Sequence, residues 1–398
     1  MSGTPRVLVA SVGLAGHALP AIALARRLDE RGADIVVWTS ERWRGLLGEL
    51  GLDGATQSPY FAVPGDVRHP GEDPALAESV QAMLPMLRDA EPDVVVSDGL
   101  TAAPALAAEI AGIPRATLFP EVYPVHGSRL PPFASGLHPP RTVVGAAAWS
   151  AGRPLRGLLP GPRAARRAFN REREELGLGP EPGFHGSLSD DLTLVATFPQ
   201  LEYPRRWPEH VHVTGPMMLD PSDVEVELPR GEEPLVVVAS STVKDLERRL
   251  VRVTLEALAQ EPVRVLVTMG AAGEPLDGPV PDNAAVADWV SYERVMPLAS
   301  AVVCNGNHGT VTWALAHGAP VLVSPAMADD AEHGARVGWS GAGLMVPGWL
   351  LRPGAVRLAM RRLLGDPAFG VRAREIASWS RANDGATRGA ELVEGLAR

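Results

Sequence analysis

The chain has 398 residues, of which 45% are hydrophobic and 21% charged, and its formal net charge is −10. This length allows two domains with cores of their own, and the composition is that of a globular protein rather than a disordered one. The acidic balance and the lack of a long basic run argue against a nucleic-acid partner. The single cysteine, Cys304, excludes an internal disulfide, which fits a reducing compartment.

No segment of the sequence predicts export or membrane insertion. Residues 1–13 pass directly into a strand pattern, without the apolar core and cleavage site of a signal peptide. No stretch approaches about 18 uninterrupted apolar residues, so we predict no transmembrane helix. We therefore expect a cytoplasmic protein.

The first segment predicts a buried parallel strand over 6–12, a helix over 18–28 and a second strand over 34–39. His17 lies where the first strand gives way to the helix, the end at which parallel sheets bind ligands. The helix dipole opposes charging of an imidazole there, so His17 is a candidate general base. Capping or packing at the turn is the alternative.

A further strand over 93–97 ends at Asp98, before a helix over 101–111 and a strand over 115–119. Asp98 is thus expected at the same sheet edge as His17, where a carboxylate could orient the imidazole and stabilise its cation. The alternative is that Asp98 caps the following helix. Helices are also predicted over 40–51, 74–90 and 162–176.

A second series of strands and helices begins after a proline-rich linker. The pattern predicts strands over 235–239, 264–268 and 285–290, a helix over 244–260, and closing helices over 354–364, 368–382 and 387–397. Ser241 and Thr242 follow the first of these strands, and their hydroxyls suit either a phosphate or an ordinary N-cap. Trp289 suits either core packing or an aromatic platform.

Residues 301–334 read as strand, glycine turn, helix and strand, the unit of a parallel sheet. The turn presents backbone N–H groups at the start of a helix, where the dipole favours an anion, and Gly306 and Gly309 would let a phosphate approach. A plain tight turn is the alternative. Asp329 and Asp330 follow the second strand and suit sugar hydroxyls.

This stretch resembles the donor-binding motif of family 1 glycosyltransferases, especially bacterial enzymes that decorate antibiotics, HGGxGT…GxPxxxxPxxxDQxxNA. The chain reads NGNHGT…GAPVLVSPAMADDAEHG. Four positions differ: Asn305 replaces the usual phosphate-binding His, Asn307 replaces Gly, Asp330 replaces Gln and His333 replaces Asn. Two other segments are similar to the family, GHALPAIALARRL with His17 and VVVSDGLTAAPALAAEIAGIP with Asp98.

The resemblance implies the α/β GT-B fold, two Rossmann-like domains that face each other across a cleft. We expect an acceptor-binding domain over 1–215, a linker over 216–233, a nucleotide-sugar donor domain over 234–375, and a C-terminal helix over 376–398 that packs back on the first domain.

The resemblance also assigns roles to residues. His17 would be the catalytic base and Asp98 its partner. Trp289 would stack on the nucleobase, and the backbone near Val290 would read the edge of the base. The remaining donor contacts would come from Ser241, Thr242, Asn305, Gly306, Asn307, His308, Gly309, Thr310, Asp329 and Asp330. His308 or His333 could partly replace the missing histidine at 305.

The implied function is inverting transfer of a sugar or deoxysugar from a nucleoside diphosphate to a natural-product aglycone, with no metal and no other cofactor. Analogy with antibiotic enzymes favours thymidine diphosphate (TDP), and a homodimer is compatible with the family. The alternatives are an N-acetylglucosaminyltransferase, a sugar-nucleotide epimerase, and a non-catalytic homologue that binds and activates a partner protein.

Overall fold

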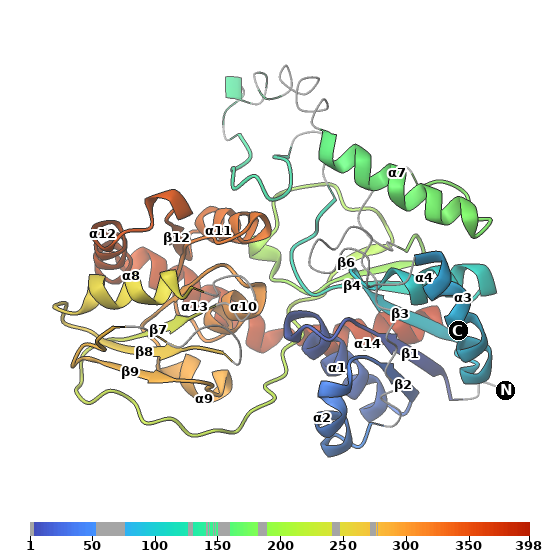
Figure 1. Ribbon diagram of the computed structural model, residues 1–398, viewed down its shortest axis with the longest axis horizontal. Helices are drawn as coiled ribbons and strands as arrows, with labels where there is room; N and C mark the ends of the chain where they lie inside the picture. The colour runs from blue at the N-terminus through green and yellow to red at the C-terminus, as the bar shows by residue number, and fades with distance from the viewer. Residues whose placement is uncertain are drawn as a thin grey trace.

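The protein, seen in a computed structural model, consists of two lobes, each built around a parallel six-stranded sheet (Figure 1). The structure describes residues 4–52, 76–125, 130–140, 160–181, 189–240, 247–270 and 278–398, together with residues 142, 144, 145, 147, 149 and 276.

The sheet of the first lobe has the strand order β2-β1-β3-β4-β5-β6. Its strands are almost continuously apolar because helices cover both faces. The order reverses between β1 and β3, so the loops that follow these two strands diverge and leave room for a ligand at the carboxyl edge. The strands are β1 (Arg6–Ala10), β2 (Asp34–Trp38), β3 (Val94–Asp98), β4 (Arg115–Phe119), β5 (Leu192–Val195) and β6 (Val211–Val213).

The helices of this lobe bury apolar faces on that sheet, and most fall where the sequence predicted them. In α1 the buried stripe includes Ile22, Leu24 and Leu28, and α4 ends at Gly112, whose left-handed backbone closes the helix. The elements are α1 (Ala15–Glu30), η1 (Glu41–Trp43), α2 (Arg44–Glu49), α3 (Leu76–Ala90), α4 (Ala102–Ala111), α7 (Pro160–Glu175) and η2 (Pro199–Leu201).

The sheet of the second lobe has the order β12-β11-β10-β7-β8-β9, which is the strand order of a Rossmann fold. Here the order reverses between β7 and β10, so the turn after β10 opens at the carboxyl edge of the sheet. The strands are β7 (Leu235–Ala239), β8 (Arg264–Thr268), β9 (Ala284–Ala287), β10 (Ala301–Cys304), β11 (Val321–Val323) and β12 (Gly343–Met345).

Two expectations for the second lobe differ from the structure. The strand predicted over 285–290 ends at Ala287, so Trp289 lies in the connection that follows it. The helix predicted from 244 is described from Arg249, and residues 241–246 lie outside the described part. The helices are α8 (Arg249–Leu258), α9 (Tyr292–Val295), η3 (Met296–Leu298), α10 (His308–Ala316), α11 (Ala328–Ser340), η4 (Gly348–Leu350), α12 (Pro353–Gly365) and α13 (Pro367–Ala382).

The last helix, α14 (Gly385–Leu396), crosses back and packs on α1 of the first lobe (Figure 1). Its Ala386, Ala390 and Val393 belong to the core of that lobe. The approach is close because Gly389 has no side chain: a Cβ there would lie 2.6 Å from the Met217 side chain. The exact domain boundaries stay predictions.

A buried ion cluster joins the two lobes. Arg336 on α11 donates to Glu332 on the same helix at 2.8 Å and to Glu202 of the first lobe at 2.7 Å. Its guanidinium also lies 4.3 Å from the ring centre of Tyr203. Arg336, Glu202 and Glu332 are each at least nine-tenths buried. Buried charges are tolerated only when paired, so this cluster holds α11 in register with the first lobe.

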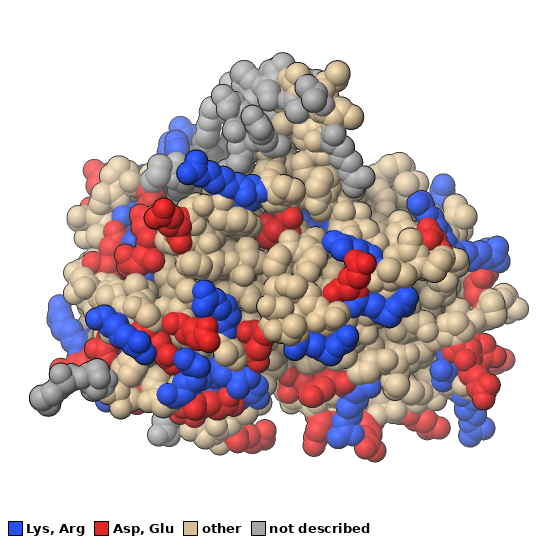
Figure 2. Space-filling model, turned by 180° about the vertical axis from the view of Figure 1, so that it is seen from behind, with Lys and Arg blue, Asp and Glu red and all other residues tan. Residues whose placement is uncertain are grey.

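The surface carries both signs of charge. Figure 2 shows Lys and Arg side chains interspersed with Asp and Glu over the face that it draws, with no broad basic area there. Among the described residues, no helix is both long and apolar enough to span a membrane.

We predict that Arg336→Met destabilises the protein by about 3–5 kcal/mol, because the substitution leaves two carboxylates buried without their cation. The measurement is the midpoint of urea unfolding. Arg388→Met is the matched control, since Arg388 pairs with Glu391 on the surface at 3.0 Å and such pairs contribute about 0–1 kcal/mol. Equal effects of the two substitutions would contradict a structural role for the buried cluster.

Candidate functional site

Asp98 is the hydrogen-bonding centre of the first lobe's carboxyl edge. It ends β3 beside the loop that leaves β1, and it is 1% exposed. Its Oδ2 accepts from the backbone N–H of Val12 at 2.8 Å and from the hydroxyl of Thr101, and its Oδ1 accepts from the N–H of Leu100 at 2.8 Å. The carboxylate is therefore fixed in position.

The structure brings His17 and Asp98 together, at a distance of 3.1 Å between His17 Nδ1 and Asp98 Oδ1. A carboxylate only accepts hydrogen bonds, so Nδ1 carries the proton and the lone pair resides on Nε2. The His17 side chain is 17% exposed. This is the arrangement of a general base held by an acid. The alternative from sequence, helix capping by Asp98, is not what the structure shows, because the N-cap of α4 is Thr101 and no side chain caps that helix.

In the second lobe, the turn after β10 presents the first residues of α10. Gly306 has φ of +109°, and a Cβ there would lie 2.8 Å from the backbone oxygen of Asp330. Because Gly306 has no side chain, the turn can lie directly against the start of α11. A Cβ at Gly309 would meet nothing within 4 Å, so the open space expected for a phosphate lies at Gly309.

Other predicted donor residues are partly engaged within the protein. The Asn305 amide is 2% exposed and donates to the Ser324 carbonyl at 3.5 Å. The hydroxyl of Thr310 lies 3.3 Å from that of Tyr292. Asn307 precedes α10 without capping it through its side chain. The sequence motif predicted none of these contacts within the protein.

The two acids after β11 differ in position. Asp330 is fully buried, and its Oδ2 accepts from the N–H groups of Ala326 and Met327 at 3.2 and 3.0 Å, so this carboxylate fixes the loop that leads into α11. Asp329 is partly exposed. Asp329 is accordingly the better placed of the two to meet a sugar hydroxyl.

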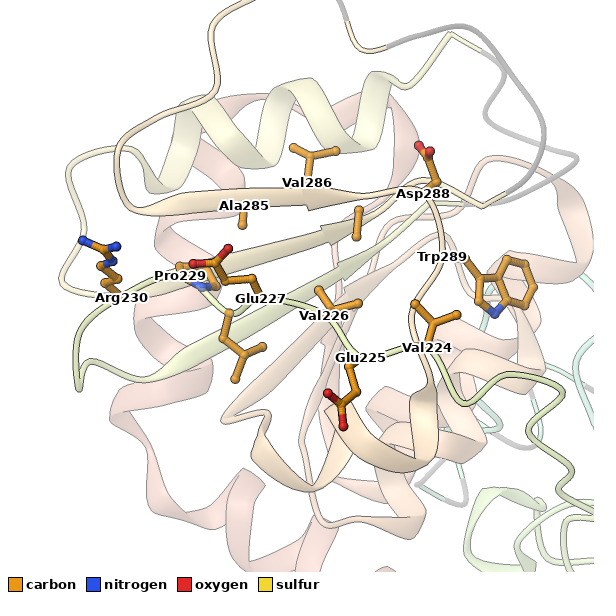
Figure 3. Close-up of a pocket in the computed structure, with 12 residues that line it drawn as sticks. Val224, Glu225, Val226, Glu227, Pro229, Arg230, Ala285, Val286, Asp288 and Trp289 are labelled. Atoms are coloured by element: carbon orange, nitrogen blue, oxygen red, sulfur yellow. The ribbon is translucent and has the colours of Figure 1, made fainter.

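Trp289 lies at one end of a groove of about 680 Å³ between the linker and β9 (Figure 3). Its ring is directed away from the other lining side chains and is partly exposed, as a base platform requires. Val290 is 3% exposed, so only its backbone could contact a base. The next residue, Ser291, donates to Asp220 of the linker at 2.9 Å and ties this connection to it.

Ser241 and Thr242, predicted to contact the donor phosphates, lie outside the described residues. Ser240, at the end of β7, is described: its hydroxyl accepts from Arg248 at 3.0 Å.

Sequence reasoning missed Glu121, which joins the two halves of the site. Glu121 follows β4 of the first lobe, and its Oε2 lies 3.4 Å from Nε2 of His333 on α11. His333 Nδ1 lies 2.7 Å from the Gly306 carbonyl, and the His333 and His308 rings are 5.0 Å apart. A carboxylate two residues beyond a predicted strand was a signal for Glu121; its histidine partner depends on how the lobes face each other.

The two lobes also approach each other between α1 and α10. A cavity of about 50 Å³ lies between the start of α1, with Gly16 and Pro20, and the start of α10, with Gly309 and Trp313. Gly16, the neighbour of the base candidate, and Gly309 of the donor turn thus line the same interdomain space. No group of three or more His, Cys, Asp or Glu in the described ranges is disposed to hold a metal ion.

Comparisons with known proteins find similarity to glycosyltransferases. Residues 252–394 match the family model "Erythromycin biosynthesis protein CIII-like, C-terminal domain". The chain is 29% identical to 4'-demethylrebeccamycin synthase of Lentzea aerocolonigenes, over 98% of this chain and 99% of that protein. It is 26% identical to UDP-glycosyltransferase 2 of Phaeomoniella chlamydospora, over 99% and 96% of the two chains.

Solved structures agree on the fold. The glycosyltransferase of kitacinnamycin superposes with a TM-score of 0.75 at 21% identity, over 99% of this chain and 100% of that one. The spinosyn rhamnosyltransferase SpnG, complexed with thymidine diphosphate, superposes with a TM-score of 0.67 at 17% identity, over 99% and 100%.

The fold is therefore GT-B, and the protein is a nucleotide-sugar-dependent glycosyltransferase. Its residues 252–394 match the erythromycin biosynthesis protein CIII-like C-terminal domain, and the whole chain is similar to natural-product glycosyltransferases.

We predict that His308 makes the protein less stable in mild acid. Burial, together with the nearby His333, lowers the pKa of His308 to about 3. Below pH 6.5 the unfolded chain binds a proton at this site that the folded chain does not, so stability falls with pH. Between pH 6.5 and 5 the loss from this one group is about 2 kcal/mol.

The measurement is urea unfolding of the wild type and of His308→Asn from pH 7.5 to pH 5. The difference between the two profiles isolates His308, since the carboxylates titrate in both proteins. Parallel profiles would show that His308 charges freely in the folded state.

Proposed function

We propose that the protein moves a sugar or deoxysugar from a nucleoside diphosphate to a hydroxyl of a natural-product aglycone, with inversion at the anomeric carbon. The first lobe would bind the acceptor and the second the donor. The observation that carries this proposal is the 3.1 Å contact between His17 and Asp98, at a sheet edge that shares an interdomain cavity with the donor turn.

In the proposed reaction, Nε2 of His17 takes the proton of the acceptor hydroxyl. The acceptor oxygen then forms a bond to the anomeric carbon, while the bond from that carbon to the diphosphate oxygen breaks on the opposite face. The transition state has oxocarbenium character, as at other glycosidic centres. Asp98 stabilises the imidazolium that results, and its three other hydrogen bonds keep it in place.

The leaving diphosphate would be stabilised by the N–H groups at the start of α10, near Gly309 and Thr310, where the helix dipole favours an anion. Thymidine diphosphate is the first nucleotide to test, because SpnG is solved with it. The name of the Phaeomoniella relative makes uridine diphosphate the second.

We predict that His17→Ala lowers turnover by about 100-fold or more, the scale of losing a general base, with a smaller change in donor KM. Turnover is measured by mass spectrometry of the glycoside formed from a panel of aglycones with TDP- and UDP-glucose. NMR of the product tests inversion, which gives a β-glycoside from an α-linked donor.

His210→Ala is the control, because His210 precedes β6 at the opposite edge of the first sheet. Turnover of His17→Ala close to that of the wild type would remove His17 as the base. A wild type that binds the nucleotide but turns over only with a second protein would favour the partner-dependent alternative.

We also predict that chelation leaves the rate unchanged, because the proposed charge stabilisation comes from α10 and its surroundings. The measurement is the initial rate with and without excess EDTA after metal-free dialysis. Loss of rate that added Mg²⁺ or Mn²⁺ restores would assign leaving-group stabilisation to a metal ion.

A further inference from the structure

The donor turn lacks a cation at its usual position. The resemblance places a phosphate-binding histidine at 305, where this chain has a neutral, buried asparagine that donates to Ser324. A diphosphate carries at least two negative charges, and the N–H groups of one helix supply only part of the compensating charge. A positive group from elsewhere in the fold would complete the site.

His333 occupies the position from which such a charge could act. Its Nδ1 is 2.7 Å from the Gly306 carbonyl, which only accepts, so Nδ1 carries a proton. The second nitrogen, Nε2, is the one that titrates, and it faces Glu121 across the lobe boundary at 3.4 Å. His333 is 3% exposed, so its charge acts with little screening by water.

The acidic surroundings of His333 favour its charged form. Burial opposes the charge, but Glu121, Asp329 and Asp330 outweigh it and raise the pKa of His333 above its ordinary value. Burial likewise opposes ionisation of Glu121, and the nearby His333, with His17 and His308, lowers the pKa of that carboxyl. Each of the two side chains therefore favours the charged form of the other.

His308 adds an unsatisfied polar group at the same place. It is the first residue of α10 and is 8% exposed, and neither ring nitrogen has a hydrogen-bond partner among the described residues, although the backbone of Ala196 is near. Buried polar atoms without partners are costly. A ligand oxygen beside His308 would satisfy one of them.

Arg336, a second cationic residue of α11, is not available for this role. Glu202 and Glu332 hold it in the ion cluster between the lobes.

We propose that His333 supplies the positive charge that binds the donor diphosphate, with His308 as a second contact, and that the diphosphate displaces Glu121 from His333. This inference rests on the proposed function, because it assumes a nucleoside diphosphate donor. Glu121 acts as a stand-in anion that neutralises His333 until the nucleotide enters the site.

The test compares thymidine diphosphate with thymidine by isothermal titration calorimetry, and uridine diphosphate with uridine in parallel. His333→Asn, which restores the residue usual in the family, is expected to lose about 10-fold or more in affinity for the diphosphate and nothing for the nucleoside. His333→Gln is a second variant that keeps a longer polar side chain.

His138→Asn is the matched control. His138 packs edge-on against Trp339 of α11 with its ring centre 6.2 Å away, so it is a histidine on the same helix interface but outside the cluster. Its diphosphate affinity should equal that of the wild type.

The pH dependence gives an independent readout. Diphosphate affinity of the wild type should fall as the pH rises through the raised pKa of His333, because the cation is lost. His333→Asn should show only the dependence that arises from the ligand and from the remaining groups. Thymidine affinity should stay constant in both proteins.

The outcomes separate the two proposals. Diphosphate affinity of His333→Asn and His333→Gln equal to that of the wild type overturns the inference and leaves the proposed function intact. Equal losses for thymidine and its diphosphate also overturn it, since His333 would then only support the Gly306 turn. A wild type that binds no nucleoside diphosphate overturns the proposed function and the inference with it.

Discussion

The buried ion cluster of Arg336, Glu202 and Glu332 is the constraint on which the rest of the active arrangement depends. It fixes α11, which carries the donor-side acids and His333, against the first lobe, which carries His17 and Glu121. Hydrophobic packing alone would tolerate sliding between the lobes, because dispersion contacts have little directional preference. Paired buried charges do not tolerate it, since any shift leaves a charge without its partner. The ion cluster thus helps to fix how the base faces the donor turn, alongside the packing of Val122, Phe198 and Leu201 against the second lobe.

Part of the site could be predicted from the sequence. Alternating strands and helices predicted parallel sheets, and the carboxyl ends of their strands share one edge, so the pattern put His17 and Asp98 at the same edge. The pattern left capping by Asp98 open, and the family resemblance was needed to predict that the two residues pair. What could not be predicted depends on distances between segments remote in sequence. The contact of Gly306 with Asp330, the capping role of Asp330 and the pairing of Glu121 with His333 each require knowledge of which helix lies against which loop.

The site places two imidazoles with opposite electrostatic preferences side by side. Against the cost of burial, carboxylates raise the pKa of His333, while burial and His333 lower that of His308 to about 3. The ring centres are 5.0 Å apart, yet the two rings favour opposite protonation states. An entering diphosphate would meet one ring that favours the charged form and one neutral ring able to donate or accept. In the proposed site, the positive charge that the family has at position 305 is supplied by His333 instead.

The position of α14 has a consequence for biosynthesis. Its Ala386, Ala390 and Val393 complete the core of the first lobe, although in sequence they follow every strand of the second lobe. The second lobe, by contrast, has all its strands between Leu235 and Met345 and can assemble before α14 leaves the ribosome. During synthesis the first lobe therefore cannot complete its core until the second lobe has been made, against the usual tendency for N-terminal domains to fold first. Until α14 has emerged, the surface of α1 that it covers stays exposed in the nascent first lobe.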